Sequence, residues 1–206
     1  MNPELKLLGI SQKTYDFVKS CENSLGNIYE GIEANEAYTQ ARVLKAFQDN
    51  CIALRHFAPT SGYGYDDIGR EALGAVFACA LEAEDALVRP QISSGTQAIF
   101  TAFSGLLEPG DVMLSLTGKP YDTLEKAIGI SGDEYCSLKR MGVIYRQVDL
   151  TADGHIDIDA AKAAITGSEK VIYFQRSRGY SWRNALTPEE MAPVFDMAVS
   201  YTHLTL

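Results

Sequence analysis

Short apolar runs alternate with longer amphipathic segments over residues 86–198. The apolar runs have the length of strands and cover 86–89, 111–116, 142–148 and 170–174. The amphipathic segments place apolar side chains at helical spacing and cover 96–107, 121–130, 158–165 and 187–198. Such an alternation is typical of a sheet whose parallel strands are joined by helices. The pattern therefore predicts an α/β domain with a largely parallel sheet.

The first third of the chain has a different pattern. Apolar positions near helical spacing, with charges between them, predict helices within residues 4–49, and a further helix is predicted over 68–81. The stretch between them, 57–67, is rich in glycine and turn residues, which predicts an extended loop. We therefore expect an N-terminal helical segment over residues 1–55, of a kind that often packs against a neighbouring domain or subunit, and the α/β domain over 56–198.

Composition excludes several classes of partner. The formal net charge is −9 and no Lys/Arg cluster is present, which argues against a nucleic-acid partner. No apolar run approaches the roughly 20 residues of a membrane span, and the N-terminus does not resemble a signal peptide. Four cysteines lie far apart without CxxC spacing, at Cys21, Cys51, Cys79 and Cys136. This favours buried free thiols over disulfides or a metal site, and a cytoplasmic location.

The last eight residues, 199–206, do not continue the pattern. Their sequence, VSYTHLTL, is the translation expected of a transposase sequencing-adapter end. A genuine β-rich tail is the alternative, although it would follow a helix that has no stop signal. We expect an adapter scar, and hence that the chain is the front portion of a longer protein.

The turn at Ser94-Gly95-Thr96 is the first candidate for chemistry. It lies immediately before the predicted helix at 96–107, where free backbone N–H groups and the helix dipole suit a phosphate. Gly95 permits close approach, and the Ser94 and Thr96 hydroxyls can donate to phosphate oxygens. Taken alone, the turn is better explained as an ordinary helix N-cap, because Ser and Thr caps are so common. Neither GxxxxGK[ST] nor GxGxxG is present, so a P-loop and a dinucleotide fingerprint are both excluded.

Two further loops fall at predicted carboxyl ends of strands, where ligands of α/β proteins bind. Tyr121 follows one strand and could stack on a planar ligand, or could simply pack against the start of its helix. The segment 175–183 follows another strand and holds three arginines, a tyrosine and the only tryptophan. It suits anion recognition or aromatic stacking, or is a solvated loop whose aromatics plug the domain edge.

Other candidate residues have simpler interpretations. Lys119 is interpreted as a loop charge, because nothing in the sequence indicates the desolvation that a reactive lysine needs. His56 and His155 have no acidic or cysteine partner at ligand spacing, so both are predicted to be structural and no metal site is expected.

The chain resembles a known family at several ordered strings. These are YGYDDIGRE at 63–71, VRPQ at 88–91, SGT at 94–96, TGKPYDTLE at 117–125 and QRSRGYSWR at 175–183. They are similar to the methionine gamma-lyase-like proteins known as aluminium-resistance proteins, which are fold-type-I, pyridoxal 5'-phosphate (PLP)-dependent relatives of cystathionine beta- and gamma-lyases. The resemblance runs through nearly all of residues 1–198. It implies a fold-type-I large domain, truncated before the small C-terminal domain.

The resemblance implies roles for individual residues. The amides of Gly95 and Thr96, with the Ser94 side chain, would hold the PLP phosphate, and Tyr121 would stack on the pyridine ring and could assist proton transfer. Tyr63 and Tyr65 would reach the phosphate of a neighbouring subunit, in a homodimer or homotetramer. Gln175 and Ser177 would lie near the cofactor ring. Gln97 departs from the family, which is expected to have histidine there.

The resemblance also implies what this chain lacks. The family's Schiff-base lysine, the aspartate that pairs with the pyridine nitrogen and the arginine for the substrate carboxylate all come later in the chain. None of the five lysines from Lys119 onwards stands in the family's lysine context. We expect the N-terminal portion of a carbon–sulfur lyase acting on a small sulfur amino acid, inactive as this fragment. The alternative is a non-catalytic fold-type-I domain that acts as a binding or assembly module.

Overall fold

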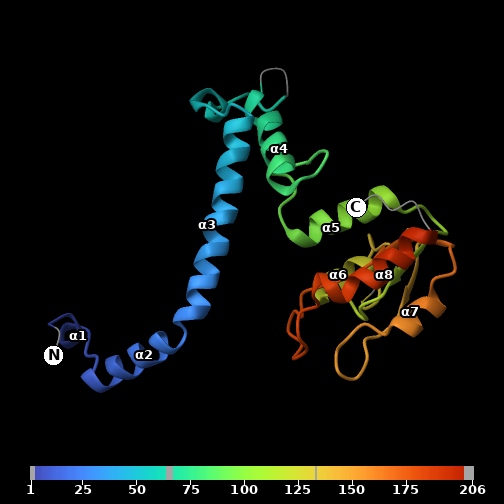
Figure 1. The fold of residues 1–206 in the computed structure, drawn as a ribbon. Helices are drawn as coiled ribbons and strands as arrows, with labels where there is room; N and C mark the ends of the chain where they lie inside the picture. Colours follow the sequence, from blue (N-terminus) through green and yellow to red (C-terminus); the bar gives the residue numbers. More distant parts are fainter. Residues whose placement is uncertain (1–2, 64–66, 133, 202–206) are drawn as a thin grey trace. The chain divides into compact units, whose positions relative to one another are not determined.

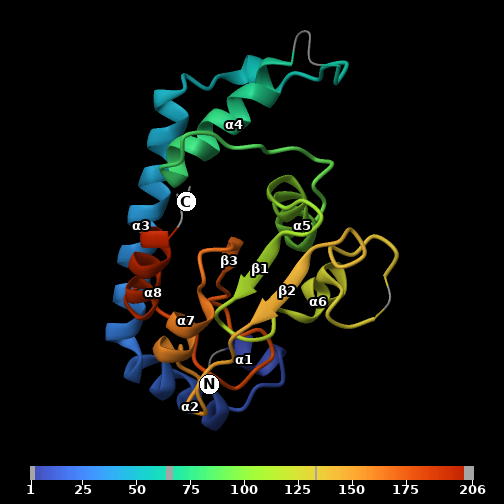
Figure 2. The ribbon, with the colours of Figure 1, turned by 90° about the vertical axis from the view of Figure 1, so that its right-hand side faces the viewer.

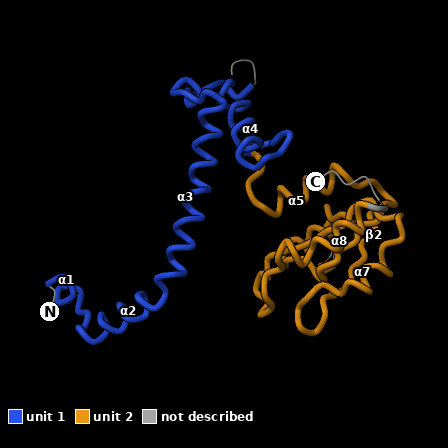
Figure 3. The backbone as a smooth tube through the Cα atoms, viewed as in Figure 1, with its two compact units in different colours: residues 1–90 blue, residues 91–206 orange. Residues whose placement is uncertain are grey.

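The structure is a computed structural model that describes residues 3–63, 67–132 and 134–201. Two compact units divide the chain, residues 1–90 and residues 91–206 (Figure 3). This division lies at Pro90, whereas the sequence placed its domain boundary at residue 55; that boundary stays a prediction. No helix in the described ranges is long and apolar enough to cross a membrane.

Unit 1 consists of helices (Figure 1). They are α1 (Pro3–Leu7), α2 (Gln12–Ser24), α3 (Gly26–Asp49), the 3-10 helix η1 (Leu54–Phe57) and α4 (Ile68–Leu81). The predicted bounds of α4 agree with the structure, because Asp67 caps the helix by accepting the N–H of Arg70 at 3.1 Å. The helices of residues 4–49 are confirmed as well.

Two glycines on α4 allow other backbone segments to pack closely against it. A Cβ at position 69 would lie 2.2 Å from the His56 carbonyl oxygen, and one at position 74 would lie 2.7 Å from the carbonyl oxygen of Ala86. Each carbonyl thus occupies the space of a missing side chain. By contrast, α2 buries no residue and α3 buries only Ala46, so both helices carry exposed apolar side chains.

Unit 2 is built on a three-stranded parallel sheet. Its strands are β1 (Val112–Ser115), β2 (Ile144–Gln147) and β3 (Glu169–Tyr173), in the order β2-β1-β3. The central strand pairs in parallel with both neighbours, so the three carboxyl ends lie at one edge. The predicted parallel α/β fold is therefore confirmed, with the strands at 111–116, 142–148 and 170–174 each recovered within a few residues.

Helices cover both faces of the sheet (Figure 2). The helices are α5 (Gly95–Leu106), α6 (Asp122–Ile128), α7 (Ile158–Ala164) and α8 (Pro188–Tyr201). On one face, Met113 packs with side chains of α5 and α6 such as Phe103 and Leu124. On the other face, Leu114 packs with side chains of α7 and α8. Successive residues of β1 thus point to opposite cores, as the period of a strand requires.

Two sequence predictions are wrong. Residues 86–89 are not a strand, because no strand in the described residues pairs with them. Arg89 instead bonds within unit 1, to the carbonyl oxygens of Val88 and Arg70 and to the Glu71 carboxylate. The four cysteines are free, as predicted, but all four are exposed and not buried. They lie at solvent-facing positions of helices α2 and α4 and of two turns.

Candidate functional site

The N-terminus of α5 presents free hydrogen-bond donors. Ser94 is its N-cap and accepts the N–H of Gln97 at 3.1 Å through Oγ, which leaves the Ser94 hydroxyl proton free to donate. In the described chain, the amides of Gly95 and Thr96 have no protein acceptor. A side chain at Gly95 would meet no protein atom within 4 Å, so the space beside this backbone is open to a ligand. This arrangement fits a phosphate group.

A side-chain hydrogen bond joins this turn to the loop that carries Tyr121. The hydroxyl oxygens of Thr96 and Thr123 lie 2.7 Å apart, which connects the first turn of α5 to the first turn of α6. Helix α6 begins after the carboxyl end of β1, so the bond brings the N-terminus of α5 to the ligand-binding edge of the sheet. The ring of Tyr121 is 36 % exposed and stacks on Tyr180 with ring centroids 5.8 Å apart.

Gln175 connects the loop after β3 to the loop that carries Tyr121. Its Oε1 accepts the N–H of Tyr121 at 2.8 Å and the hydroxyl of Tyr173 at 3.2 Å, while its Nε2 donates to the carbonyl oxygen of Ser177 at 3.3 Å. The N–H of Gln175 donates to Thr117 Oγ1 at 2.8 Å. The structure therefore brings the loops after β1 and β3 together, with Gln175 holding the backbone of Tyr121 in place.

The arginines of residues 175–183 have a role that the sequence did not indicate. The Arg183 guanidinium donates to the carbonyl oxygens of Gln175, Arg176, Ser177 and Asn184 at 2.7–3.4 Å. Arg176 donates through Nε to the carbonyl oxygen of Leu186. Two of the three arginines thus hold the loop itself.

The aromatics of the same loop do not plug the domain edge. Tyr180 is 86 % exposed and Trp182 is 97 % exposed. Both rings are therefore presented to solvent by a loop whose backbone is held by arginines.

The remaining predicted residues lie elsewhere. Tyr63 belongs to unit 1 and is exposed, and Tyr65 lies outside the described residues. Lys119 pairs with Glu125 at 2.7 Å, in agreement with its interpretation as a loop charge. Gln97 accepts the N–H and the hydroxyl of Ser93 through Oε1, so it helps to hold the turn that precedes α5.

Both histidines have structural contacts. Nδ1 of His56 accepts the N–H of Ala53 at 2.9 Å and thereby caps η1. His155 pairs with Glu190, a partner 35 positions away that sequence spacing does not indicate. This contact raises the pKa of His155, first through the hydrogen bond and then through the charge of the Glu190 carboxylate.

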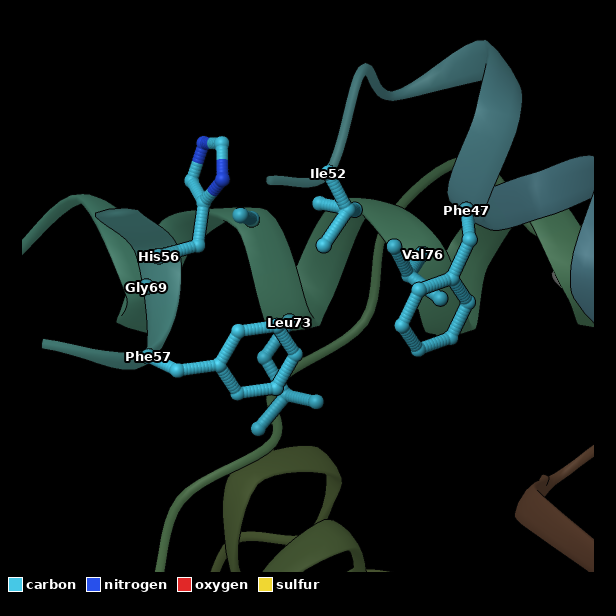
Figure 4. A pocket seen from close by; sticks show the side chains of 8 residues that line it. Phe47, Ile52, His56, Phe57, Gly69, Leu73 and Val76 are labelled. Carbon is cyan, nitrogen blue, oxygen red and sulfur yellow. The ribbon is translucent and has the colours of Figure 1, made fainter. Parts of the chain in front are cut away.

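Two hollows of the described surface lie apart from the predicted site residues. A hollow of about 60 Å³ lies in unit 1 between η1, α4 and the end of α3, where Phe57 lies against Leu73 and Phe47 points toward Val76 (Figure 4). Its volume is small beside the roughly 300–1,000 Å³ of sites for small organic ligands. A shallow hollow of about 430 Å³ in unit 2, lined by Phe100 and residues 134–137 among others, contains none of the predicted site residues.

The fold and the joined loops define an α/β protein whose candidate ligand-binding residues lie at the carboxyl edge of a parallel sheet. The model of the family described as methionine gamma-lyase matches residues 14–203. The chain belongs to the methionine gamma-lyase family.

Similar proteins and solved structures are described as lyases or are uncharacterised. The Bacillus subtilis protein YnbB is 46 % identical over 171 residues, which is 82 % of this chain and 41 % of YnbB. A candidate cystathionine beta-lyase involved in aluminium resistance from Listeria innocua has a TM-score of 0.86 at 40 % identity, over 92 % of this chain and 46 % of that one. A carbon–sulfur lyase involved in aluminium resistance from Clostridium novyi has a TM-score of 0.86 at 37 % identity, over 97 % and 48 %. The chain thus spans less than half the length of these relatives.

Proposed function

We propose that this chain forms the cofactor-phosphate and ring-stacking part of a PLP-dependent carbon–sulfur lyase that acts on sulfur amino acids. One observation carries the proposal: hydrogen bonds from Thr96 to Thr123 and from Tyr121 to Gln175 join three loops at the carboxyl edge of the sheet. Membership of the methionine gamma-lyase family and the relatives described as carbon–sulfur or cystathionine lyases support it.

The residues of this edge divide between the two ends of PLP. The amides of Gly95 and Thr96 and the hydroxyl of Ser94 would bind the phosphate, and the Tyr121 ring would lie on the pyridine ring. Gln175 and Ser177 would border that ring. When bound, PLP supplies an electron sink for negative charge at the α-carbon of an amino acid. Tyr121 contributes a hydroxyl proton, and Gln175 fixes the backbone from which that hydroxyl projects.

We also propose that this chain does not catalyse thiol elimination by itself. Covalent attachment of PLP needs a desolvated lysine amine. Lys119, the lysine nearest in sequence to Tyr121, is 55 % exposed and is engaged by Glu125. The lysine, the aspartate for the pyridine nitrogen and the arginine for the substrate carboxylate are proposed to lie in the part of the relatives that this chain does not match. In a complete homodimer or homotetramer, Tyr63 and Tyr65 would reach the phosphate of a neighbouring subunit.

Binding of PLP to this chain tests the proposal. Titration followed by PLP absorbance and by the fluorescence of the single tryptophan, Trp182, should show saturable binding that inorganic phosphate competes away. Ser94→Ala removes one phosphate donor and should weaken affinity about tenfold, the effect of one hydrogen bond to a charged group. Ser104→Ala is the matched control, because Ser104 lies on the same helix and donates to the Phe100 carbonyl oxygen, away from the turn. Equal affinity in the wild type and Ser94→Ala would contradict the phosphate assignment.

A second candidate is a non-catalytic assembly module. The exposed apolar side chains of α2 and α3, among them Phe17, Ile32 and Leu44, favour it. Analytical ultracentrifugation beside the PLP titration separates the two: self-association without PLP binding supports the module, and PLP binding supports the lyase part.

A further inference from the structure

A second tyrosine lies directly against Tyr121. The rings of Tyr121 and Tyr180 are stacked, with centroids 5.8 Å apart and planes inclined by 30°. Tyr180 exposes 86 % of its surface, so burial in the core does not explain its position. Stacked aromatic pairs contribute beyond the area that they bury. The stacking itself therefore accounts for the position of the Tyr180 ring against Tyr121.

The loop that carries Tyr180 is held rigidly. The guanidinium of Arg183 ties together four carbonyl oxygens between residues 175 and 184, and the N–H of Ser181 closes a turn on the carbonyl oxygen of Arg178 at 3.0 Å. Tyr180 lies inside that turn. Its backbone is thus fixed by hydrogen bonds on both sides, although its side chain is exposed.

Gly179 allows the loop to approach Tyr121. Its φ is +57°, a left-handed conformation that favours glycine, and a Cβ there would lie 3.0 Å from Cδ2 of the Tyr121 ring. The Tyr121 ring therefore lies against the backbone of Gly179 and the ring of Tyr180. The Tyr121 backbone N–H donates to Gln175.

We propose that Tyr180 is a positioning residue of the candidate site: its ring, stacked on Tyr121, sets the plane of the Tyr121 ring. The consequence for the cofactor rests on the proposed function, because Tyr121 is the ring assigned to PLP. The contact itself is independent of that assignment.

The acidity of Tyr121 reflects the same contact. The hydrogen bond with Tyr180, followed by partial desolvation and by the nearby Tyr180 and Asp122 groups, raises the pKa of Tyr121. At neutral pH, Tyr121 therefore keeps its proton. Removal of the Tyr180 hydroxyl should lower the pKa of Tyr121 toward its ordinary value, since the largest cause of the shift is lost.

Two variants separate the ring from the hydroxyl. Tyr180→Phe keeps the stack and removes the hydroxyl, whereas Tyr180→Ala removes both. Trp182→Phe is the matched control, because it changes an even more exposed aromatic side chain of the same loop. Far-UV circular dichroism verifies that each variant is folded.

The first measurement is an NMR titration of Cζ-labelled tyrosines, with the Tyr121 signal assigned by its loss in Tyr121→Phe. The pKa of Tyr121 should fall in Tyr180→Phe and Tyr180→Ala and stay at the wild-type value in Trp182→Phe. An unchanged pKa of Tyr121 in both Tyr180→Phe and Tyr180→Ala overturns the contact between the two side chains.

The second measurement is PLP affinity by absorbance. Tyr180→Ala should weaken binding about two- to tenfold, as expected for loss of an aromatic pair, and Tyr180→Phe should bind within twofold of the wild type. Wild-type affinity in Tyr180→Ala overturns the role of the ring. If the wild-type chain binds no PLP, the proposed function and the cofactor role of Tyr180 both fail, and the NMR titration then decides the Tyr121–Tyr180 contact on its own.

Discussion

The buried carboxylate of Glu169 predicts a large and pH-dependent loss of stability in Glu169→Gln. The side chain of Glu169 is only 1 % exposed. One carboxylate oxygen accepts the N–H groups of Thr166 and Gly167, each at 3.0 Å, and the other accepts the Thr166 hydroxyl at 2.9 Å and Arg146 at 3.0 Å. Because Arg146 stands on β2 and Glu169 on β3, their ion pair crosses the central strand.

The magnitude follows from these four donors. An amide group at position 169 would turn an N–H₂ toward two of them, and hydrogen bonds to a charged group contribute about 1.5–3 kcal/mol each. Loss of one partner from a buried ion pair costs about 3–5 kcal/mol, but the Arg146 side chain is 40 % exposed and can be hydrated. We therefore expect Glu169→Gln to lower the free energy of unfolding by about 3 kcal/mol at pH 7.

The pH dependence gives a second signature. Burial alone would raise the pKa of Glu169, but the Thr166 hydroxyl and neighbouring backbone N–H groups outweigh burial and lower it below the ordinary 4.5. A lowered pKa in the folded state stabilises above the pKa of the unfolded state, and this stabilisation is lost as the pH falls through the folded value. The difference between wild type and variant should consequently shrink on acidification from pH 7 to below pH 4.5.

Urea unfolding followed by circular dichroism, with hydrogen exchange of peptides from β1–β3, measures both effects. Glu108→Gln, at an exposed glutamate of the same unit, is the control and should change stability by less than about 0.5 kcal/mol. A loss below 1 kcal/mol at pH 7, or a difference that stays constant with pH, would refute the reasoning.

Three other outcomes follow from contacts described above. Gly69→Ala should destabilise unit 1 by about 2–3 kcal/mol in thermal unfolding, because its methyl group would overlap the His56 carbonyl oxygen. Gly105→Ala lies on open helix surface and should stabilise slightly, so equal effects of the two variants would contradict the close packing at Gly69. Thr123→Val removes the hydrogen bond to Thr96 and should weaken PLP affinity severalfold without unfolding the chain. Unchanged affinity would show that this bond does not shape the turn at residues 94–96. Glu190 raises the pKa of His155, so the stabilisation from this pair is present below about pH 6.5 and is lost as the pH rises through the pKa of His155 in the folded state. The difference in the free energy of unfolding between the wild type and His155→Gln should therefore vanish at high pH. An ordinary pKa for His155 in an NMR titration would contradict this.

The sequence predicted elements whose signals are local. Asp67 and Ser94 are cap residues with free side-chain acceptors, and the helices begin where these residues predict. The strand predicted at 86–89 is wrong because an apolar run specifies an extended backbone but not a partner, and pairing depends on chain segments far away.

The candidate site shows the same division. The free amides beside Gly95 follow from the helix start and could be predicted. The bonds from Thr96 to Thr123 and from Gln175 to Tyr121 join residues 27 and 54 positions apart, and no local pattern encodes them. The role of Arg183 was missed for a similar reason. Sequence spacing does not distinguish an arginine that binds backbone carbonyl oxygens from one that binds an anion.

The order of the sheet also affects how the chain meets other chains. Strands β2 and β3 each have one side without a strand neighbour in the described ranges, and an open edge can template the addition of a foreign strand. Both edges are short, and each carries a charged side chain that reaches solvent, Arg146 on β2 and Lys170 on β3. An incoming strand would have to desolvate these positive charges. Charge on the two outer strands therefore disfavours the addition of a foreign strand to the sheet.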